Sequence, residues 1–313
     1  MSEKNILIIG HSGFIGQSLY EKFKNKKKNI FLISRKKIFN QKNEVACDVF
    51  NDYSWFKLLK NNSKVFFLLF NNNLYELEKN QLYLKKIKKF SINFNEYILK
   101  KKLKIDFIFT STVTIYGKTN PNILVNEKLN DNPISNYDRA KKILEDTFFK
   151  YEKEQKINFV SLRLSNIYGL SHLNTQINRG FLNKLILNIY KEKRIYIYGR
   201  GNKLRNYLHI DDLVDALILS SKKMKKISGK IFILCHNKSY SFNDIIRITS
   251  KVLKVNIKLT KINYPKNINS IEKRSFTGSN KLIKNYIGWK PKINIQSGIK
   301  KILTSINRYA NNN

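Results

Sequence analysis

Tyr137 and Lys141 are the residues of this sequence whose types and spacing most directly suggest chemistry. At positions i and i+4 of a helix they share one face. A tyrosine has a pKa of about 10 and is a poor acid or base at neutral pH, but a neighbouring ammonium group stabilises the phenolate and lowers that pKa. Thr112, farther upstream, offers a hydroxyl group for the same substrate oxygen. The three residues together predict a proton-transfer site.

Glycines at a spacing of three residues predict a second site, for the pyrophosphate of a dinucleotide. An apolar run comes directly before them and a helical pattern follows. In such a strand–turn–helix unit the glycines allow a tight turn and close packing, and the first N–H groups of the helix bind the anion. The alternative is an ordinary glycine-rich connection. The cofactor-binding candidates here are Gly10, Gly13, Phe14, Ile15 and Gly16.

The second apolar run, residues 29–33, ends in basic residues and not in an acidic one. A site selective for NAD usually places a carboxylate there, which accepts a hydrogen bond from the ribose 2′-hydroxyl. Arg35 instead suits the 2′-phosphate of NADP. NADP is therefore favoured over NAD, although a basic residue in so lysine-rich a chain also fits a solvated turn. Asp48, near the end of the third run, fits either the adenine edge of the cofactor or a turn.

Five apolar runs alternate with helical patterns and must position these residues. Such alternation indicates an α/β fold with a doubly wound parallel sheet, in which ligands bind beyond the carboxyl ends of the strands. The hydroxyl-rich stretch 110–114 follows the fifth run directly. We expect residues 1–170 to form this Rossmann-like dinucleotide-binding domain, completed by a strand near 230–235. Residues 171–313 are expected to form mainly a smaller α/β substrate-binding portion.

The formal net charge of +38 suggests a nucleic acid as an alternative partner. Lysine supplies most of the 60 basic residues and is spread along the chain, which favours a solvated surface over a groove of arginines and aromatic rings. We expect no membrane-spanning segment, because no apolar stretch approaches the necessary length. Cys47 and Cys235 have neither disulfide nor metal-ligand spacing, so we expect no metal and a cytoplasmic location.

The motifs, taken in order, resemble those of the extended short-chain dehydrogenase/reductases, the NAD-dependent epimerase/dehydratase family that acts on nucleotide sugars. The resemblance covers nearly the whole chain. It includes the glycine stretch, Thr110–Gly117, Tyr137 with Lys141, Arg163–Gly169, residues 198–213 and Gly288–Pro291.

This resemblance implies roles for individual residues. Tyr137 would be the proton donor and acceptor, and Lys141 would tune its pKa and bind the nicotinamide ribose. Thr112 would be the hydroxyl partner, with the neighbouring Ser111 as the fallback. The implied ligands of the nucleotide-sugar diphosphate are Asn166, Arg205, the segment around Asn178 and, with looser spacing, Arg274. A homodimer is also implied.

The resemblance leaves the reaction open between two outcomes. Family dehydratases carry Asp-Glu directly after the catalytic threonine, whereas Val113 and Thr114 stand here, so 4,6-dehydration is not expected. We favour an epimerase that acts by transient oxidation and reduction at C4 of the sugar. An NADPH-dependent 4-keto-sugar reductase is the alternative, and a non-catalytic member of the fold that senses NADP or binds RNA is a remote one.

Overall fold

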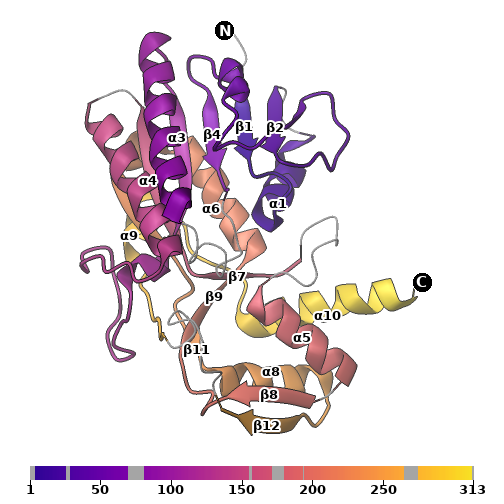
Figure 1. The fold of residues 1–313 in the computed structure, drawn as a ribbon. Helices are drawn as coiled ribbons and strands as arrows, with labels where there is room; N and C mark the ends of the chain where they lie inside the picture. The colour runs from indigo at the N-terminus through magenta and orange to yellow at the C-terminus, as the bar shows by residue number, and fades with distance from the viewer. Residues whose placement is uncertain are drawn as a thin grey trace.

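The computed structural model describes residues 4–25, 29–69, 81–154, 157–170, 180–192, 194–263 and 274–311. At its centre is a seven-stranded sheet with strand order β10-β6-β5-β4-β1-β2-β3 (Figure 1). All of its strand pairs are parallel, which confirms the predicted doubly wound α/β sheet. The strands are β1 (Ile6–Ile9), β2 (Ile30–Ser34), β3 (Glu44–Ala46), β4 (Lys64–Phe67), β5 (Asp106–Thr112), β6 (Asn158–Leu164) and β10 (Lys230–Leu234).

Helices cover both faces of this sheet, which explains why its strands are nearly continuous apolar runs. Alternate residues of a strand point to opposite faces. Leu7 and Ile9 of β1 therefore pack into one core, and Ile6 and Ile8 into the other. The first core contains α3 (Gln81–Lys100) and α4 (Asn136–Lys153), and the second contains α1 (Phe14–Phe23), α6 (Ile210–Lys222), α7 (Met224–Ile227) and α9 (Lys281–Ile287) (Figure 1).

A smaller portion of the protein has its own apolar core, at the bottom of Figure 1. Its helices are α5 (Phe181–Glu192), α8 (Phe242–Leu253) and α10 (Ile295–Asn311). A three-stranded sheet of β7 (Asn166–Tyr168), β9 (Arg205–His209) and β11 (Ser239–Tyr240) connects to this portion, and β8 (Arg194–Tyr198) pairs with β12 (Lys258–Ile262) at its far end.

The structure refines the predicted elements at several places. The third strand ends at Ala46, because the Asp48 carbonyl accepts hydrogen bonds from Asn51 N and Asp52 N and turns the chain. Helix α3 is described from Gln81. Beyond residue 170 the chain returns to the main sheet through α6, α7, β10 and α9. In the described residues, no helix is both long and apolar enough to cross a membrane.

Candidate active site

The glycine loop, Gly10–Gly16, connects β1 to α1 at the carboxyl end of the sheet. Gly10 has a φ of +89°, which favours glycine. A Cβ atom at Gly16 would lie 2.4 Å from the Gly10 carbonyl oxygen, so only glycine allows α1 to pack this closely. Gly13 is the N-cap of α1 and makes no side-chain cap, and Phe14 and Ile15 are the first residues of the helix. The half-buried start of this helix, which has no side-chain cap, therefore fits the pyrophosphate of a dinucleotide.

A buried His11–Glu44 pair connects the glycine loop to the loop that follows β2. His11 Nε2 lies 2.6 Å from Glu44 Oε1, and both side chains are fully buried. Since a carboxylate only accepts, Nε2 carries the proton. Glu44 also accepts from the backbone N–H groups of Ile38 (2.6 Å), Phe39 (3.1 Å) and Gln41 (3.3 Å). The carboxylate of Glu44 therefore holds residues 38–41 against the cofactor loop.

The loop after β2 presents cationic side chains to solvent. Arg35, Lys36 and Lys37 are exposed, and Ser34 Oγ donates to the Lys36 carbonyl oxygen at 2.8 Å. Asp48 is also exposed, and its carboxylate accepts from Phe50 N at 3.2 Å within its own turn. Arg35 is thus free to contact a phosphate, whereas the observed contact of Asp48 shapes the turn.

Helix α4 carries Tyr137 and Lys141 and begins with a capping box. Ser135 Oγ accepts from Asp138 N, and the Asp138 carboxylate accepts from Ser135 N. This cap fixes the first turn, where Tyr137 lies. Lys141 Nζ donates to the Thr110 carbonyl oxygen at 2.5 Å and lies 4.7 Å from the centre of the Phe109 ring. Burial lowers the pKa of Lys141 to about 7, against the opposing effect of Glu145.

The hydroxyl groups of Thr112 and Tyr137 meet at the carboxyl end of β5. The two side chains form a hydrogen bond, although burial still raises the pKa of Tyr137 to about 12. The sequence predicted a shift in the opposite direction. Burial penalises the phenolate more than this hydrogen bond stabilises it, so in the protein alone Tyr137 is a neutral phenol.

Arg274 and Asp138 form a buried ion pair beside these hydroxyl groups. Arg274 Nη2 donates to Asp138 Oδ2 at 3.2 Å, and Nη1 donates to the Thr114 carbonyl oxygen at 2.6 Å. Arg274 is 6% exposed and Asp138 is fully buried. Arg274 was predicted to contact a diphosphate, and here most of its guanidinium group binds the protein.

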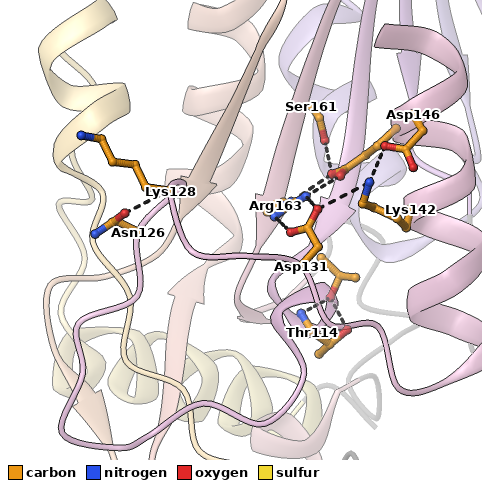
Figure 2. A network of polar contacts seen from close by, with 10 residues as sticks. Thr114, Asn126, Lys128, Asp131, Lys142, Asp146, Ser161 and Arg163 are labelled. Carbon is orange, nitrogen blue, oxygen red and sulfur yellow. Dashed lines mark hydrogen bonds and ion pairs between the residues drawn. The ribbon is translucent and has the colours of Figure 1, made fainter. Parts of the chain in front are cut away.

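Arg163, at the end of β6, fixes the position of α4 relative to the sheet (Figure 2). Its guanidinium group binds Asp131 with two hydrogen bonds of 2.6 and 2.9 Å, and Glu145 of α4 with two of 2.7 and 3.1 Å. Lys142 also approaches Asp131, at 3.6 Å. Arg163 is 1% exposed, so its guanidinium group is shielded from water, and its contacts with Glu145 hold the turn after Lys141 against β6.

Two of the predicted diphosphate ligands, Asn166 and Arg205, lie on the three-stranded sheet. Asn166 of β7 pairs with Tyr207 of β9, two residues beyond Arg205. Paired residues point to the same face of a sheet, and so do residues two apart in one strand. Asn166 and Arg205 therefore lie on the same face. Asn166 is exposed and Arg205 half-buried. Asn178 lies outside the described residues.

Several buried polar atoms have no partner in the described part of the chain. They include Ser111 Oγ, Ser165 Oγ and Arg274 Nε. Ser111 is in β5, and Ser165 follows β6 directly. Unpaired buried polar groups are costly in a finished structure, so these three atoms are candidates for hydrogen bonds to a bound ligand. Together with the glycine loop they fit a dinucleotide and a polar substrate at this edge of the sheet.

Three contributors to this site were not found by sequence reasoning. They are Glu44, the hydroxyl group of Thr114, and Asp138. Their partners are distant in the sequence, and no spacing rule predicts these contacts. Only Asp138 had a local signal, since Ser135 three residues before it predicts a capping box.

Comparisons with known proteins agree with this geometry. The chain matches the model of the NAD dependent epimerase/dehydratase family over residues 6–235. A dTDP-D-glucose 4,6-dehydratase of Dictyostelium discoideum is 31% identical over 252 residues, which are 70% of this chain and 56% of that relative. An uncharacterised protein of Schizosaccharomyces pombe is 26% identical over 223 residues, which are 64% of this chain and 60% of that relative. The chain thus spans less than two thirds of the length of each of these two relatives.

Solved structures share the whole fold. The UDP-glucose 4-epimerase of Thermotoga maritima, solved with UDP-glucose, has a TM-score of 0.85 at 21% identity, with 98% of this chain and 99% of that chain covered. RMD from Pseudomonas aeruginosa, complexed with NADPH, has a TM-score of 0.76 at 16% identity, with 96% of this chain and 98% of that chain covered.

Proposed function

The chain belongs to the NAD-dependent epimerase/dehydratase family, and we propose that it is an NAD(P)-dependent nucleotide-sugar epimerase that acts by transient oxidation and reduction at C4 of the sugar. The observation that carries this proposal is the hydrogen bond between Thr112 and Tyr137 together with the contact of Lys141 with the Thr110 carbonyl oxygen, at the same edge of the parallel sheet as the glycine loop. A non-catalytic binder has no need of that arrangement.

Each of these residues has a chemical role in the proposed reaction. Tyr137 takes the proton of the C4 hydroxyl group and later returns it to the ketone oxygen. Thr112 forms a hydrogen bond with that oxygen, and Lys141 binds the nicotinamide ribose and stabilises the phenolate when it is charged. A bound NAD(P)⁺ would supply the hydride acceptor and a positive charge beside the phenolate. If the ketone turns over before it is reduced, the product is the C4 epimer.

The proposed substrate is a nucleoside diphosphate sugar. Arg205 and Asn166 lie on one face of the three-stranded sheet, and a guanidinium group suits a phosphate. Arg274 keeps its Nε–H for an anionic oxygen, since that atom has no partner among the described residues. The UDP-glucose bound by the Thermotoga maritima enzyme is a ligand of this class.

The site does not support 4,6-dehydration. Val113 is 7% exposed and apolar, and Thr114 has no group that titrates near neutral pH. The nearby Asp138 carboxylate is fully buried and bound by Arg274, so it does not replace the missing acidic pair.

An NADPH-dependent 4-keto-sugar reductase is the second candidate, and the environment of Arg35 favours it. Glu44, the buried acid near the end of β2, accepts four hydrogen-bond donors from the protein and is not available to a ribose hydroxyl. The exposed Arg35 fits a 2′-phosphate. NADP is therefore slightly favoured as the cofactor.

One experiment separates these functions. The protein is incubated with a panel of UDP-, dTDP- and GDP-sugars and with NAD⁺, NADP⁺ or NADPH, and both the products and the net cofactor change are followed. An epimer formed without net cofactor change supports the epimerase. Oxidation of NADPH in a one-to-one ratio with reduction of a 4-keto-sugar, included in the panel, supports the reductase. Absence of turnover, combined with RNA binding that weakens steeply as salt rises, would favour the non-catalytic alternative.

A further inference from the structure

We infer that Arg274 is a positioning residue, which ties the turn after β5 to the first turn of α4 and so holds the hydroxyl groups of Thr112 and Tyr137 where both can reach one substrate oxygen. This role is distinct from the diphosphate contact that the sequence predicted for Arg274. Its catalytic consequence rests on the proposed function, whereas the contacts that carry it do not.

The two hydroxyl groups come from separate elements of the fold. Thr112 ends β5 and is the N-cap of the 3₁₀ helix η2 (Val113–Tyr116), and its Oγ1 accepts from Thr114 N at 3.2 Å. Tyr137 lies in the first turn of α4, which residues 117–135 separate from η2. The hydrogen bond between Thr112 and Tyr137 therefore depends on contacts that hold η2 against α4.

Arg274 provides such contacts with both ends of its guanidinium group. Nη1 donates to the Thr114 carbonyl oxygen at 2.6 Å, and Nη2 donates to Asp138 Oδ2 at 3.2 Å. Thr114 Oγ1 also donates to Asp138 Oδ1 at 2.5 Å, so the two elements are linked from two sides. Asp138 directly follows Tyr137 in the chain. Because a guanidinium group is planar and its donors point in fixed directions, it sets the spacing between its two acceptors.

Arg274 is itself anchored beside the candidate diphosphate site. Ser275 Oγ accepts from Leu204 N at 3.3 Å, and Phe276 N donates to the Leu204 carbonyl oxygen at 3.0 Å. Leu204 directly precedes Arg205, a predicted ligand of the diphosphate. The segment that begins at Arg274 therefore fixes the position of the acid–base pair relative to the place where the nucleotide of the substrate would bind.

The loss of Arg274 should act on the rate of the chemical step. Its removal takes a donor from the Thr114 carbonyl oxygen and leaves the buried Asp138 carboxylate without its counter-charge. Both changes free η2 to move relative to α4, and a displacement of about 1 Å can cost about 10²-fold in rate. A residue that bound only the diphosphate would instead change KM and leave kcat unaltered.

The experiment compares Arg274→Ala with two other arginine variants. Arg205→Ala removes the other candidate diphosphate ligand, and Arg139→Ala removes an exposed guanidinium group from the start of α4. Because Arg274→Ala leaves a buried carboxylate unpaired, the double variant with Asp138→Asn is made as well. The values of kcat and KM are measured for the nucleotide sugar that the panel identifies, with and without guanidinium chloride at a concentration that leaves the wild type folded.

We expect Arg274→Ala to lower kcat by about 10²-fold with a smaller change in KM, and added guanidinium to restore kcat by about tenfold or more. Methylammonium has the same charge but no planar fork, and it should not restore kcat. Arg205→Ala should mainly raise KM, and Arg139→Ala should change neither quantity.

A change confined to KM in Arg274→Ala would overturn the inference, and so would a loss of kcat that guanidinium fails to restore. If Arg274→Ala does not fold, the double variant decides, since the buried charge is absent from it. A loss of kcat in that variant supports the positioning role, and an unaltered kcat overturns it.

Amide hydrogen exchange needs no substrate and separates this inference from the proposed function. The backbone N–H groups of Thr114 and Ser135 should exchange about tenfold faster or more in Arg274→Ala than in Arg139→Ala, because local opening becomes easier. Faster exchange combined with a wild type that turns over no sugar refutes only the proposed function. Unchanged exchange combined with an active wild type refutes only the positioning role.

Discussion

His11 Nε2 donates to Glu44 Oε1 at 2.6 Å, and this buried bond joins the loop that would receive the pyrophosphate to the loop that would receive the ribose. His11 occupies a non-glycine position of the glycine loop, and Glu44 lies outside the motifs identified in the sequence. Burial lowers the pKa of His11 although Glu44 opposes this effect, so the pair is a neutral imidazole on a carboxylate at neutral pH. The structure therefore connects two parts of the candidate cofactor site through one side-chain contact.

Glu44→Gln should destabilise the protein by about 1–3 kcal/mol, because an amide cannot accept from four donors and leaves buried N–H groups unpaired. Urea unfolding would measure this loss, and dinucleotide affinity measured by calorimetry should fall with it. Glu96→Gln, at an exposed site, is the matched control and should leave both quantities unchanged. Equal free energies of unfolding for Glu44→Gln and Glu96→Gln would contradict the structural role assigned to Glu44.

Arg35→Ala should weaken NADP⁺ binding by about tenfold or more and leave NAD⁺ binding nearly unchanged, since the guanidinium group would contact only the 2′-phosphate. Binding of both dinucleotides would be followed by calorimetry at one fixed salt concentration. Arg247→Ala on α8 removes the same charge from an exposed helix and serves as the control. A parallel loss of affinity for both cofactors would argue against a 2′-phosphate site at Arg35.

The glycine loop allows two substitutions with different expected effects. Gly16→Ala should destabilise the fold by several kcal/mol, because its Cβ would lie 2.4 Å from Gly10 O. Gly13→Ala places a Cβ 3.2 Å from the same oxygen, which is tight but close to tolerable. Gly13→Ala should therefore mainly weaken dinucleotide binding, and it should lower the free energy of unfolding less than Gly16→Ala does. Thermal unfolding and cofactor titration of both variants would test this order, and the reverse order would contradict it.

Lys141 should make the stability of the cofactor-free protein depend on pH. Burial lowers its pKa to about 7, whereas in the unfolded chain it is about 10.4. Between these values the unfolded state binds more protons, so the free energy of unfolding should rise with pH across this window. Lys141→Met removes this contribution, and the difference between wild type and variant in urea unfolding at pH 7 and pH 9.5 isolates it. A difference that does not change with pH would show that Lys141 is not buried as described.

The sequence allowed the central sheet and the main candidate residues to be predicted because each leaves a local signal. Apolar runs such as Ile6–Ile9 occur in strands buried on both faces, and Gly10 to Gly16 are close together in the chain. The strand Lys230–Leu234 was also predictable, because its residues form an apolar run. These features depend on neighbours within a few residues.

The remaining features depend on contacts between distant segments. Arg274 and Asp138 are separated by 136 residues, and His11 and Glu44 by 33. No spacing rule links such pairs. The shift in the pKa of Tyr137 was predicted in the wrong direction for the protein without ligands, because the sequence shows the nearby lysine but not how deeply Tyr137 is buried.

The most direct test of the proposed epimerase is the comparison of wild type and Tyr137→Phe. Each is incubated with the oxidised dinucleotide and the nucleotide sugar that the panel identifies. C4-epimer formation is followed by proton NMR while absorbance reports any net reduced dinucleotide. We expect the wild type to form the epimer with no net reduced dinucleotide, and Tyr137→Phe to be slower by about 10²–10⁴-fold, because the group that exchanges the substrate proton is gone. Epimer formation at the wild-type rate by Tyr137→Phe would contradict the assignment of this site.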